Sequence, residues 1–526
     1  MVKLLHQIID DSADHKPDGH AFRCAGGHIT YGELALRTNR LARILAEHGV
    51  QPGDRVGVFL RKSLETAVAV FGIMKAGAAY VPLDPNLPTA RLESILIDCD
   101  IRHLVTHDAL TAQLEGLADR LATESALQFV IGPNLPGVAR WTVLPWNDVF
   151  SAPGAPLDPA RISPGDPAYL MYTSGSTGMP KGIIHTHSSG LAYARCAAET
   201  YGLSRDDRLS GFPPLHFDQS TFDYFSGPLV GATTVIIPES YMLMPASLSK
   251  HMEDERLTIW YSVPYALTQL LLRGVLHDRD LRSLRWVLFG GETFPMKHLR
   301  SLMQLWPHAR FSNVYGPAEV NQCTFYHLPE PPPAEAEAIP IGPTWHIAAG
   351  LVLDRDDQII PAGQIGELVV RTPTMMQGYW NRTDLNADAF YYPEGDADPK
   401  PYYRTGDLVR RSEDGLYWFV GREDRQVKTR GYRVELDEVE AVLSSHPAVA
   451  EVAVYTVSDT EGRPQICARV LPHSDAEVGA RDVLAFAARH LPAYAVPARV
   501  EFADGFPRTS SGKIDRHLLG SMTVES

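Results

Sequence analysis

Residues 168–187, AYLMYTSGSTGMPKGIIHTH, join a short apolar run to a loop that is rich in glycine and hydroxyl side chains. The apolar run predicts a buried strand, and the loop after it, residues 172–182, predicts a flexible turn that is dense in hydrogen-bond donors. Because glycine has no Cβ, backbone N–H groups in such a turn can approach an anion closely. Lys181 adds a positive charge, so the segment predicts a phosphate-binding loop.

The Walker phosphate loop, G-x-x-x-x-G-K-[ST], differs from this one at its lysine. In the Walker loop a helix begins at the lysine, whereas here Pro180 precedes Lys181 and Gly182 follows it. The next residues, IIHTH, have the composition of a strand, so the sequence offers no helix start at this point. The loop therefore indicates a different class of phosphate-binding protein.

Helical and strand patterns alternate on both sides of this loop. Residues 31–50 carry apolar side chains at helical spacing, and DRVGVFL (54–60) and AAYVPLD (78–84) are typical of short buried strands. TTVIIPE (233–239) and RWVLFGG (285–291) repeat the strand pattern further along the chain. This alternation predicts an α/β fold whose sheets are mostly parallel.

The C-terminal third of the chain has a different pattern. Residues 339–370 contain short strand patterns separated by Gly and Pro turns, which predicts a β-rich subdomain, and residues 415–455 read as strand, turn, strand and amphipathic helix. A chain of 526 residues is too long for a single core. We therefore expect a large N-terminal α/β domain at residues 1–422, with two α/β sheets and the β-rich subdomain, and a small mobile α+β domain at residues 425–526.

The composition narrows the possible partners. The formal net charge of −15 argues against nucleic acid, whose phosphates require a basic surface. No apolar run approaches the ~20 residues of a membrane span, and acidic residues interrupt the apolar N-terminus, so we expect no signal peptide. The five cysteines have no paired spacing for zinc or for disulfides. These features predict a cytoplasmic protein with no nucleic acid and no membrane as partner.

Five motifs extend over nearly the whole chain: the loop at residues 172–182, NVYGPAE (313–319), YYRTGDLVRR (402–411), GREDRQVKTRGYRVELDEVE (421–440) and PRTSSGKIDR (507–516). In these motifs and in their order the chain resembles the adenylate-forming (ANL) superfamily, which includes acyl-CoA synthetases, luciferases and the adenylation domains of non-ribosomal peptide synthetases. Within it, the chain looks like a free-standing adenylation domain, an AMP-forming ligase of an amino acid and a carrier protein. The resemblance implies ATP and Mg²⁺ as cofactors.

For the nucleoside, the resemblance implies that Tyr315 stacks on adenine and that Asp407, assisted by Arg422, binds both ribose hydroxyls. Structural alternatives exist, because a tyrosine beside a Gly-Pro turn can fill a core and an aspartate after glycine suits a plain turn. The other implied ATP and AMP contacts come from the loop and from two further segments: Thr173, Ser174, Gly175, Ser176, Thr177, Gly178, Gly290, Gly291, Glu292, Asn313 and Gly316.

Three charged residues are implied to be catalytic. Lys513 would contact both the substrate carboxylate and the α-phosphate, Glu319 would bind magnesium, and Lys181 would add charge near the phosphates. A hard cation that also binds phosphate oxygens needs only one or two carboxylates, so a single glutamate suffices. Ala318 departs from the family pattern, because most relatives carry threonine there and a hydroxyl contact to the α-phosphate is absent.

The segment PPLHFDQSTFDYFSG (213–227) indicates the substrate class. In relatives that activate amino acids, an aspartate at the position of Asp218 pairs with the α-ammonium, which needs a countercharge when it is buried. The alternative is that Asp218 caps a helix that starts near Ser220. The other implied substrate contacts are mostly apolar and include no second charge: Gln219, Phe222, Tyr261, Leu288, Gly290, Val314, Gln322 and Cys323.

These contacts favour a small or medium neutral amino acid. The combination of Tyr261, Leu288 and Cys323 resembles that of prolyl-carrier ligases, so proline is the best prediction. Gln219 and Gln322 depart from that combination and could bind a polar side chain or a β-amino group.

A second reaction is implied for the C-terminal domain. Asp424 is the implied hinge, and Lys428, Arg430 and Gly431 would line the path of a phosphopantetheine thiol. We expect this thiol on a separate carrier protein, as in non-ribosomal peptide synthesis and the antibiotic and other secondary metabolite pathways that depend on it.

Two alternatives stay open. The first is a carboxylate–CoA ligase, against which Asp218 counts. The second is a catalytically inactive protein that only binds adenylate. Ala318 is the one feature in favour of the inactive protein, while the intact Lys513, Glu319 and Asp407 oppose it.

Overall fold

The computed structural model describes residues 2–121, 127–132, 141–158, 161–175, 179–395, 400–459, 463–473, 478–503, 505–508 and 514. The chain divides into two compact units. The first comprises Met1–Pro85, Leu96–Tyr172 and Gly182–Glu423, and the second comprises Asn86–Ile95, Thr173–Lys181 and Asp424–Ser526. The sequence-based domains, 1–422 and 425–526, and a hinge at Asp424 stay predictions.

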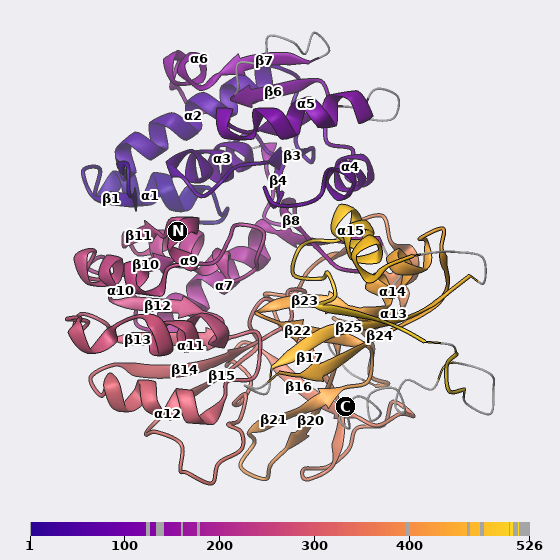
Figure 1. Ribbon diagram of the computed structural model, residues 1–526. Helices are drawn as coiled ribbons and strands as arrows, with labels where there is room; N and C mark the ends of the chain where they lie inside the picture. The colour runs from indigo at the N-terminus through magenta and orange to yellow at the C-terminus, as the bar shows by residue number, and fades with distance from the viewer. Residues whose placement is uncertain are drawn as a thin grey trace. The chain divides into compact units, whose positions relative to one another are not determined.

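The first large sheet of unit 1 has the strand order β18-β9-β8-β4-β3-β5-β6-β7. Figure 1 labels β3, β4, β6, β7 and β8 of this sheet. The strands from β3 to β8 are parallel neighbours, and their sequences are almost continuously apolar because both faces of a parallel sheet are covered. The strands are β3 (Arg55–Val58), β4 (Ala79–Pro82), β5 (His103–Val105), β6 (Phe129–Gly132), β7 (Thr142–Pro145), β8 (Pro167–Thr173), β9 (Lys181–Thr186) and β18 (Gly378–Tyr379).

Helices α2 (Tyr31–Glu47) and α3 (Leu64–Lys75) pack against each other in the core beside this sheet. Helix α2 starts with a capping box, in which Thr30 and Glu33 exchange hydrogen bonds, and it ends just before Gly49, whose φ is +94°. The apolar spacing of residues 31–50 therefore predicted a helix, which the structure has over Tyr31–Glu47.

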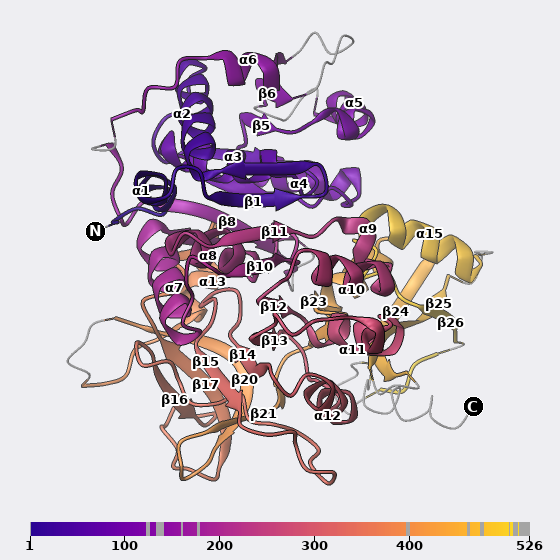
Figure 2. The ribbon, with the colours of Figure 1, turned by 90° about the vertical axis from the view of Figure 1, so that its left-hand side faces the viewer.

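The second large sheet has the order β15-β14-β13-β12-β10-β11-β1-β2, in which only the edge strands β2 and β15 are antiparallel to their neighbours. Helices α10 (Pro245–Asp254), α11 (Pro264–Arg273) and α12 (Met296–Leu305) lie side by side along it and share a core with it (Figures 1 and 2). The strands are β1 (His20–Cys24), β2 (Gly27–Thr30), β10 (Arg208–Gly211), β11 (Thr233–Ile236), β12 (Ile259–Ser262), β13 (Trp286–Gly290), β14 (Arg310–Tyr315) and β15 (Thr324–Leu328).

A third, antiparallel sheet completes the first unit, where the Gly and Pro turns predicted a β-rich subdomain. Its order is β16-β17-β20-β19, with β21 paired to β20. The strands are β16 (Ala349–Leu353), β17 (Ile365–Arg371), β19 (Phe390–Tyr391), β20 (Tyr402–Arg411) and β21 (Tyr417–Arg422). The remaining helices of the N-terminal part are α1 (Gln7–His15), α4 (Thr89–Asp98), α5 (Thr111–Arg120), α6 (Trp146–Ser151), α7 (His187–Thr200), α8 (Gly227–Leu229), α9 (Glu239–Met242) and α13 (Thr383–Asp388).

The C-terminal part of the second unit is a small α+β structure with its own core. The predicted α/β class, with several sheets and a smaller C-terminal domain, is therefore confirmed. The elements of this C-terminal part are β22 (Gln426–Thr429), β23 (Tyr432–Glu435), α14 (Leu436–Ser444), β24 (Val449–Ser458), β25 (Pro464–Pro472), α15 (Ala480–His490) and β26 (Arg499–Phe502).

Among the described residues, none of the helices combines the length and apolar character that a membrane span needs.

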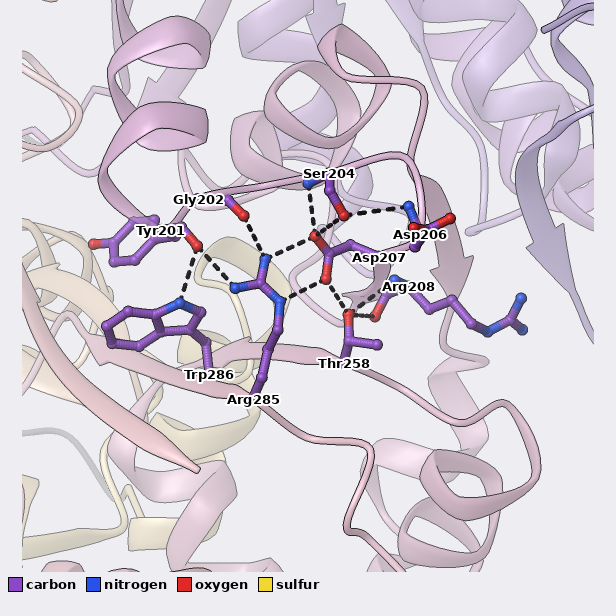
Figure 3. A network of polar contacts seen from close by, with 9 residues as sticks. All are labelled: Tyr201, Gly202, Ser204, Asp206, Asp207, Arg208, Thr258, Arg285 and Trp286. Atoms are coloured by element: carbon purple, nitrogen blue, oxygen red, sulfur yellow. Dashed lines mark hydrogen bonds and ion pairs between the residues drawn. The ribbon is translucent and has the colours of Figure 1, made fainter. Parts of the chain in front are cut away.

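A polar network fastens the end of α7 to the second sheet (Figure 3). Arg285 donates two hydrogen bonds to the carboxylate of Asp207, each of 2.7 Å, and a third to the carbonyl of Tyr201 at 3.0 Å. Burial alone would raise the pKa of Asp207, but the bonds from Arg285 and Thr258 outweigh it and lower this pKa. Asp207 therefore stays charged and holds Arg285 against the carbonyl of Tyr201.

Replacing Arg285 with alanine is expected to lower the free energy of unfolding by about 1–3 kcal/mol, because the buried carboxylate of Asp207 loses its bidentate partner. Urea denaturation monitored by circular dichroism measures the effect. Arg282→Ala is the matched control, since Arg282 pairs with Asp280 on the surface, and it should leave the unfolding midpoint unchanged. Equal midpoints for the two variants would contradict a structural role of the network.

Candidate active site

The carboxyl ends of β13 and β14 lie next to each other at the centre of the candidate site. The two strands are parallel, with Gly290 opposite Val314. A Cβ on Gly290 would lie 2.2 Å from the carbonyl oxygen of Val314, so only glycine fits there. Gly291 has a φ of +94°, which also favours glycine. The backbone thus explains both glycines, and their contact with adenine stays a prediction.

Two predicted ATP contacts near these strand ends have partners within the protein. Glu292 Oε1 accepts a hydrogen bond from the backbone N–H of Tyr265 at 2.7 Å. Asn313 Nδ2 donates to the carbonyl of Pro340 at 2.9 Å. These bonds tie the strand ends to neighbouring segments, and nucleotide contacts of the two side chains stay predictions.

Tyr315, Asp407 and Arg422 come together from three different strands. The hydroxyl of Tyr315, the last residue of β14, donates a hydrogen bond to Asp407 Oδ2 at 2.5 Å. Arg422, the last residue of β21, pairs with the other oxygen of the same carboxylate. Burial, followed by the charge of Asp407, raises the pKa of Tyr315, so its hydroxyl keeps the proton that it donates. The three residues predicted for the nucleoside form one hydrogen-bonded group.

The turn after Tyr315 carries Glu319 into the interior. A Cβ on Gly316 would lie 2.2 Å from the carbonyl oxygen of Asn321, so the turn closes only with glycine. Glu319 is fully buried, and its Oε1 accepts a hydrogen bond from the hydroxyl of Tyr379 at 2.8 Å. This bond offsets part of the cost of burying a carboxylate.

His185, on β9, supports the same turn. Its Nε2 lies 2.9 Å from the carbonyl oxygen of Ala318. Burial lowers the pKa of His185 to about 4, so the imidazole is neutral near pH 7 and donates from this nitrogen. Neither His185 nor Tyr379 was among the predicted site residues. In the sequence, His185 stands out only as a polar residue within the apolar segment after the loop, and no feature distinguishes Tyr379.

Asp218 lies in a turn just before the π-helical segment η3 (Phe222–Ser226). Its Oδ1 accepts a hydrogen bond from the backbone N–H of Gln219 at 2.9 Å, and its main-chain carbonyl accepts one from the hydroxyl of Thr221 at 2.6 Å. The residue is half-buried, and its charge adds to the effect of burial in raising the pKa of Tyr261. The amide of the adjacent Gln219 bonds to Gly290, the last residue of β13, so Asp218 lies near the end of this strand. Its pairing with a substrate ammonium stays a prediction.

The apolar residues predicted to contact the substrate come together in one cluster. Phe222, Tyr261, Leu288 and Val314 belong to it, and the rings of Phe222 and Tyr261 meet edge to face with centroids 5.5 Å apart. Cys323 lies in the neighbouring cluster, which also contains Tyr315. Gln219 and Gln322 are also buried.

The phosphate loop is described only in part. Ser176, Thr177, Gly178 and Lys513 lie outside the described residues. In the described remainder of the loop, a Cβ on Gly175 would lie 2.1 Å from the carbonyl oxygen of Met179, so the turn requires glycine there. The roles of the other loop residues stay predictions: Thr173, Ser174 and Lys181, of which Lys181 begins β9.

The predicted thiolation residues lie in the hairpin β22–β23. Thr429 pairs with Tyr432, so Arg430 and Gly431 form a two-residue turn, and both have positive φ values of 53° and 83°. Lys428 lies on β22 just before the turn. The positive φ of the turn explains why residue 431 is a glycine. The part of Gly431 in a thiol path stays a prediction.

Two proteins similar to this chain are both named L-proline–[L-prolyl-carrier protein] ligase. The one from Pseudomonas fluorescens is 33% identical over 98% of this chain and 99% of its own length. The one from Streptomyces coelicolor is 36% identical over 94% of this chain and 92% of its own length.

A solved structure is also similar to this chain over nearly its whole length. An amide bond synthetase, McbA from Marinactinospora thermotolerans, has a TM-score of 0.86 and 25% identity, and the match covers 99% of both chains. The family described as AMP-binding enzyme matches residues 9–380, and the AMP-binding enzyme C-terminal domain matches residues 438–513. The first match covers most of the chain, so this protein belongs to the family of AMP-binding enzymes.

Proposed function

We propose that the protein activates L-proline with ATP to prolyl-AMP and then transfers the prolyl group to the phosphopantetheine thiol of a separate carrier protein. The observation that carries the proposal is the carboxylate of Asp218, which lies four residues before Phe222 of the apolar cluster and next to Gln219, whose amide bonds to Gly290. The carboxylate suits the α-ammonium of an amino acid, and the cluster suits a small side chain without charge. The two ligases named for L-proline support this substrate. A cytoplasmic location is part of the proposal.

In the first reaction an oxygen of the proline carboxylate attacks the α-phosphorus of ATP, and pyrophosphate leaves. Tyr315, Asp407 and Arg422 would hold the nucleoside, in keeping with the hydrogen bonds that already join them. Lys513 would stabilise the negative charge that develops at the α-phosphate.

Magnesium is part of the proposal, with Glu319 as its protein ligand. No three histidine, cysteine, aspartate or glutamate side chains gather into a metal site in the described ranges. A magnesium ion that also binds phosphate oxygens and water needs only one or two carboxylates, so the donor set fits. When bound, the ion would screen the charge of the phosphates.

In the second reaction the carrier's thiol attacks the prolyl carbonyl, and AMP leaves. Rotation about Asp424 would replace Lys513 with the hairpin that carries Lys428, Arg430 and Gly431. The position of Asp424 at the first residue of a compact segment, Asp424–Ser526, supports such a hinge.

The test is ATP–pyrophosphate exchange with the full chain over the standard amino acids, β-amino acids and aryl acids. L-Proline is expected to give the fastest exchange. Loading is then compared between a phosphopantetheinylated carrier protein and coenzyme A, and only the carrier should be loaded. Preferential loading of coenzyme A would favour the CoA ligase, and exchange with none of the compounds would favour an inactive adenylate-binding protein.

Replacing Tyr315 with phenylalanine is expected to raise the KM for ATP about tenfold, because Asp407 loses a short hydrogen bond and its carboxylate is held less firmly for the ribose. The ring, and with it the stacking surface, is retained. Exchange kinetics at varied ATP and varied proline measure the effect. The KM for proline serves as the internal control, and an equal rise in both constants would contradict a role in nucleoside binding.

A further inference from the structure

Each of the two glutamines among the predicted substrate contacts uses one amide N–H inside the protein. Gln219 Nε2 donates to the carbonyl of Gly290 at 3.3 Å, and Gln322 Nε2 donates to the hydroxyl of Tyr201 at 3.1 Å. Both glutamines are buried, with 8% and 2% of their surface exposed. Because a buried amide donor without an acceptor is costly, these bonds determine how the two side chains are oriented.

Tyr201 is itself held rigidly. It follows α7 directly, and its carbonyl accepts hydrogen bonds from Trp286 Nε1 and Arg285 Nη1, each of 3.0 Å (Figure 3). Its ring meets Phe222 and Trp286 edge to face, with centroids 5.9 Å and 5.5 Å apart. Tyr201 is therefore buried and fixed by packing, and it contacts two predicted substrate contacts, the ring of Phe222 and the amide of Gln322.

We propose that Tyr201 is a specificity-determining positioning residue, which keeps the amide of Gln322 away from the substrate and so makes the side-chain part of the site apolar. With this donor engaged, the substrate's side chain meets Phe222, Tyr261 and their apolar neighbours. An apolar ring such as that of proline is then preferred over the same ring with a polar group. The inference rests on the proposed function and goes beyond the residues that the sequence analysis named.

The test compares L-proline with trans-4-hydroxy-L-proline and with 4-methyl-L-proline. The first analogue adds a hydroxyl to the same ring, and the second adds an apolar group of similar size. In Tyr201→Phe the amide of Gln322 loses its acceptor and becomes available to the substrate's hydroxyl. We expect the ratio of kcat/KM for proline over hydroxyproline to fall about tenfold, while the ratio for proline over methylproline stays within twofold.

Because both substrates are measured on the same preparation, the fraction of folded enzyme cancels from each ratio. Tyr391→Phe is the matched control. Tyr391 lies on β19 of the third sheet, outside this cluster, and its hydroxyl donates to the carbonyl of Asp357 at 3.3 Å. This variant should leave both ratios unchanged. In a Gln322→Met background, Tyr201→Phe should no longer change the hydroxyproline ratio, because the amide is gone.

An unchanged hydroxyproline ratio in Tyr201→Phe would overturn the inference. So would the same shift in Tyr391→Phe, or a shift that persists in the Gln322→Met background. If the unaltered chain exchanges proline and only these ratios fail, the proposed function stands and the inference alone is wrong. If the unaltered chain gives no exchange with any amino acid, the proposed function fails and the inference falls with it.

Discussion

Replacing Lys513 with alanine is expected to reduce proline-dependent pyrophosphate exchange by about 10²–10³-fold, which is the usual cost of losing one donor to a developing oxyanion. The lysine lies in PRTSSGKIDR (507–516), and its role rests on the family motif. Since Tyr315, Asp407 and Arg422 stay in place, ATP binding is expected to change little. Exchange rates give the first quantity, and isothermal titration with ATP gives the second.

Arg508 provides a matched control for Lys513. Replacing Arg508 removes a cation from the same segment, but the guanidinium of Arg508 pairs with the exposed carboxylate of Glu451 at 2.7 Å. Arg508→Ala should therefore keep exchange within about twofold of the unaltered enzyme. Retained exchange in Lys513→Ala would show that another group supplies the charge, and a similar loss in Arg508→Ala would point to damage of the whole segment.

Replacing Asp218 with asparagine is expected to raise the KM for proline about 10²–10³-fold, because the buried substrate ammonium loses its countercharge while the side chain keeps its shape. The KM for ATP should stay within about twofold, since the nucleoside group of Tyr315 and Asp407 is unaltered. Exchange kinetics with varied proline and varied ATP separate the two constants.

The control for Asp218 is Asp206→Asn. Asp206 is exposed, so this variant removes the same charge from the surface of the same unit and should leave both constants unchanged. A proline KM that rises equally in both variants would reflect the overall charge of the protein. A proline KM that is unchanged in Asp218→Asn would mean that Asp218 acts only through its bonds to Gln219 and Thr221.

Much of the fold could be predicted from local sequence. The strands at DRVGVFL, AAYVPLD, TTVIIPE and RWVLFGG, and the helix in residues 31–50, are all present. Each of them depends on the apolar periodicity and the turn residues of a single segment, which can be read without knowing what packs against it. The order of strands in the sheets, such as β1 between β2 and β11, could not be predicted, because it depends on contacts between distant segments.

The candidate site divides in the same way. Motifs and their resemblance to a family identified Tyr315 and Asp407, but not the hydrogen bond between these residues, which lie 92 positions apart. They gave no sign of Tyr379, whose hydroxyl bonds to Glu319 from 60 positions away. A side chain's type is visible in the sequence, whereas its hydrogen-bond partner depends on which backbone and side-chain atoms the fold brings within reach.

Gln322 shows the difference between what the sequence predicts and what the fold decides. The sequence by itself determined that an amide stands among apolar contacts, and it left open whether that amide would bind a polar substrate. Only the tertiary structure, which brings Tyr201 to within 3.1 Å from 121 positions away, decided that one N–H of this amide is engaged by the protein. The physical reason is that a buried donor takes the acceptor that lies nearest in space, and nearness in space is created by packing.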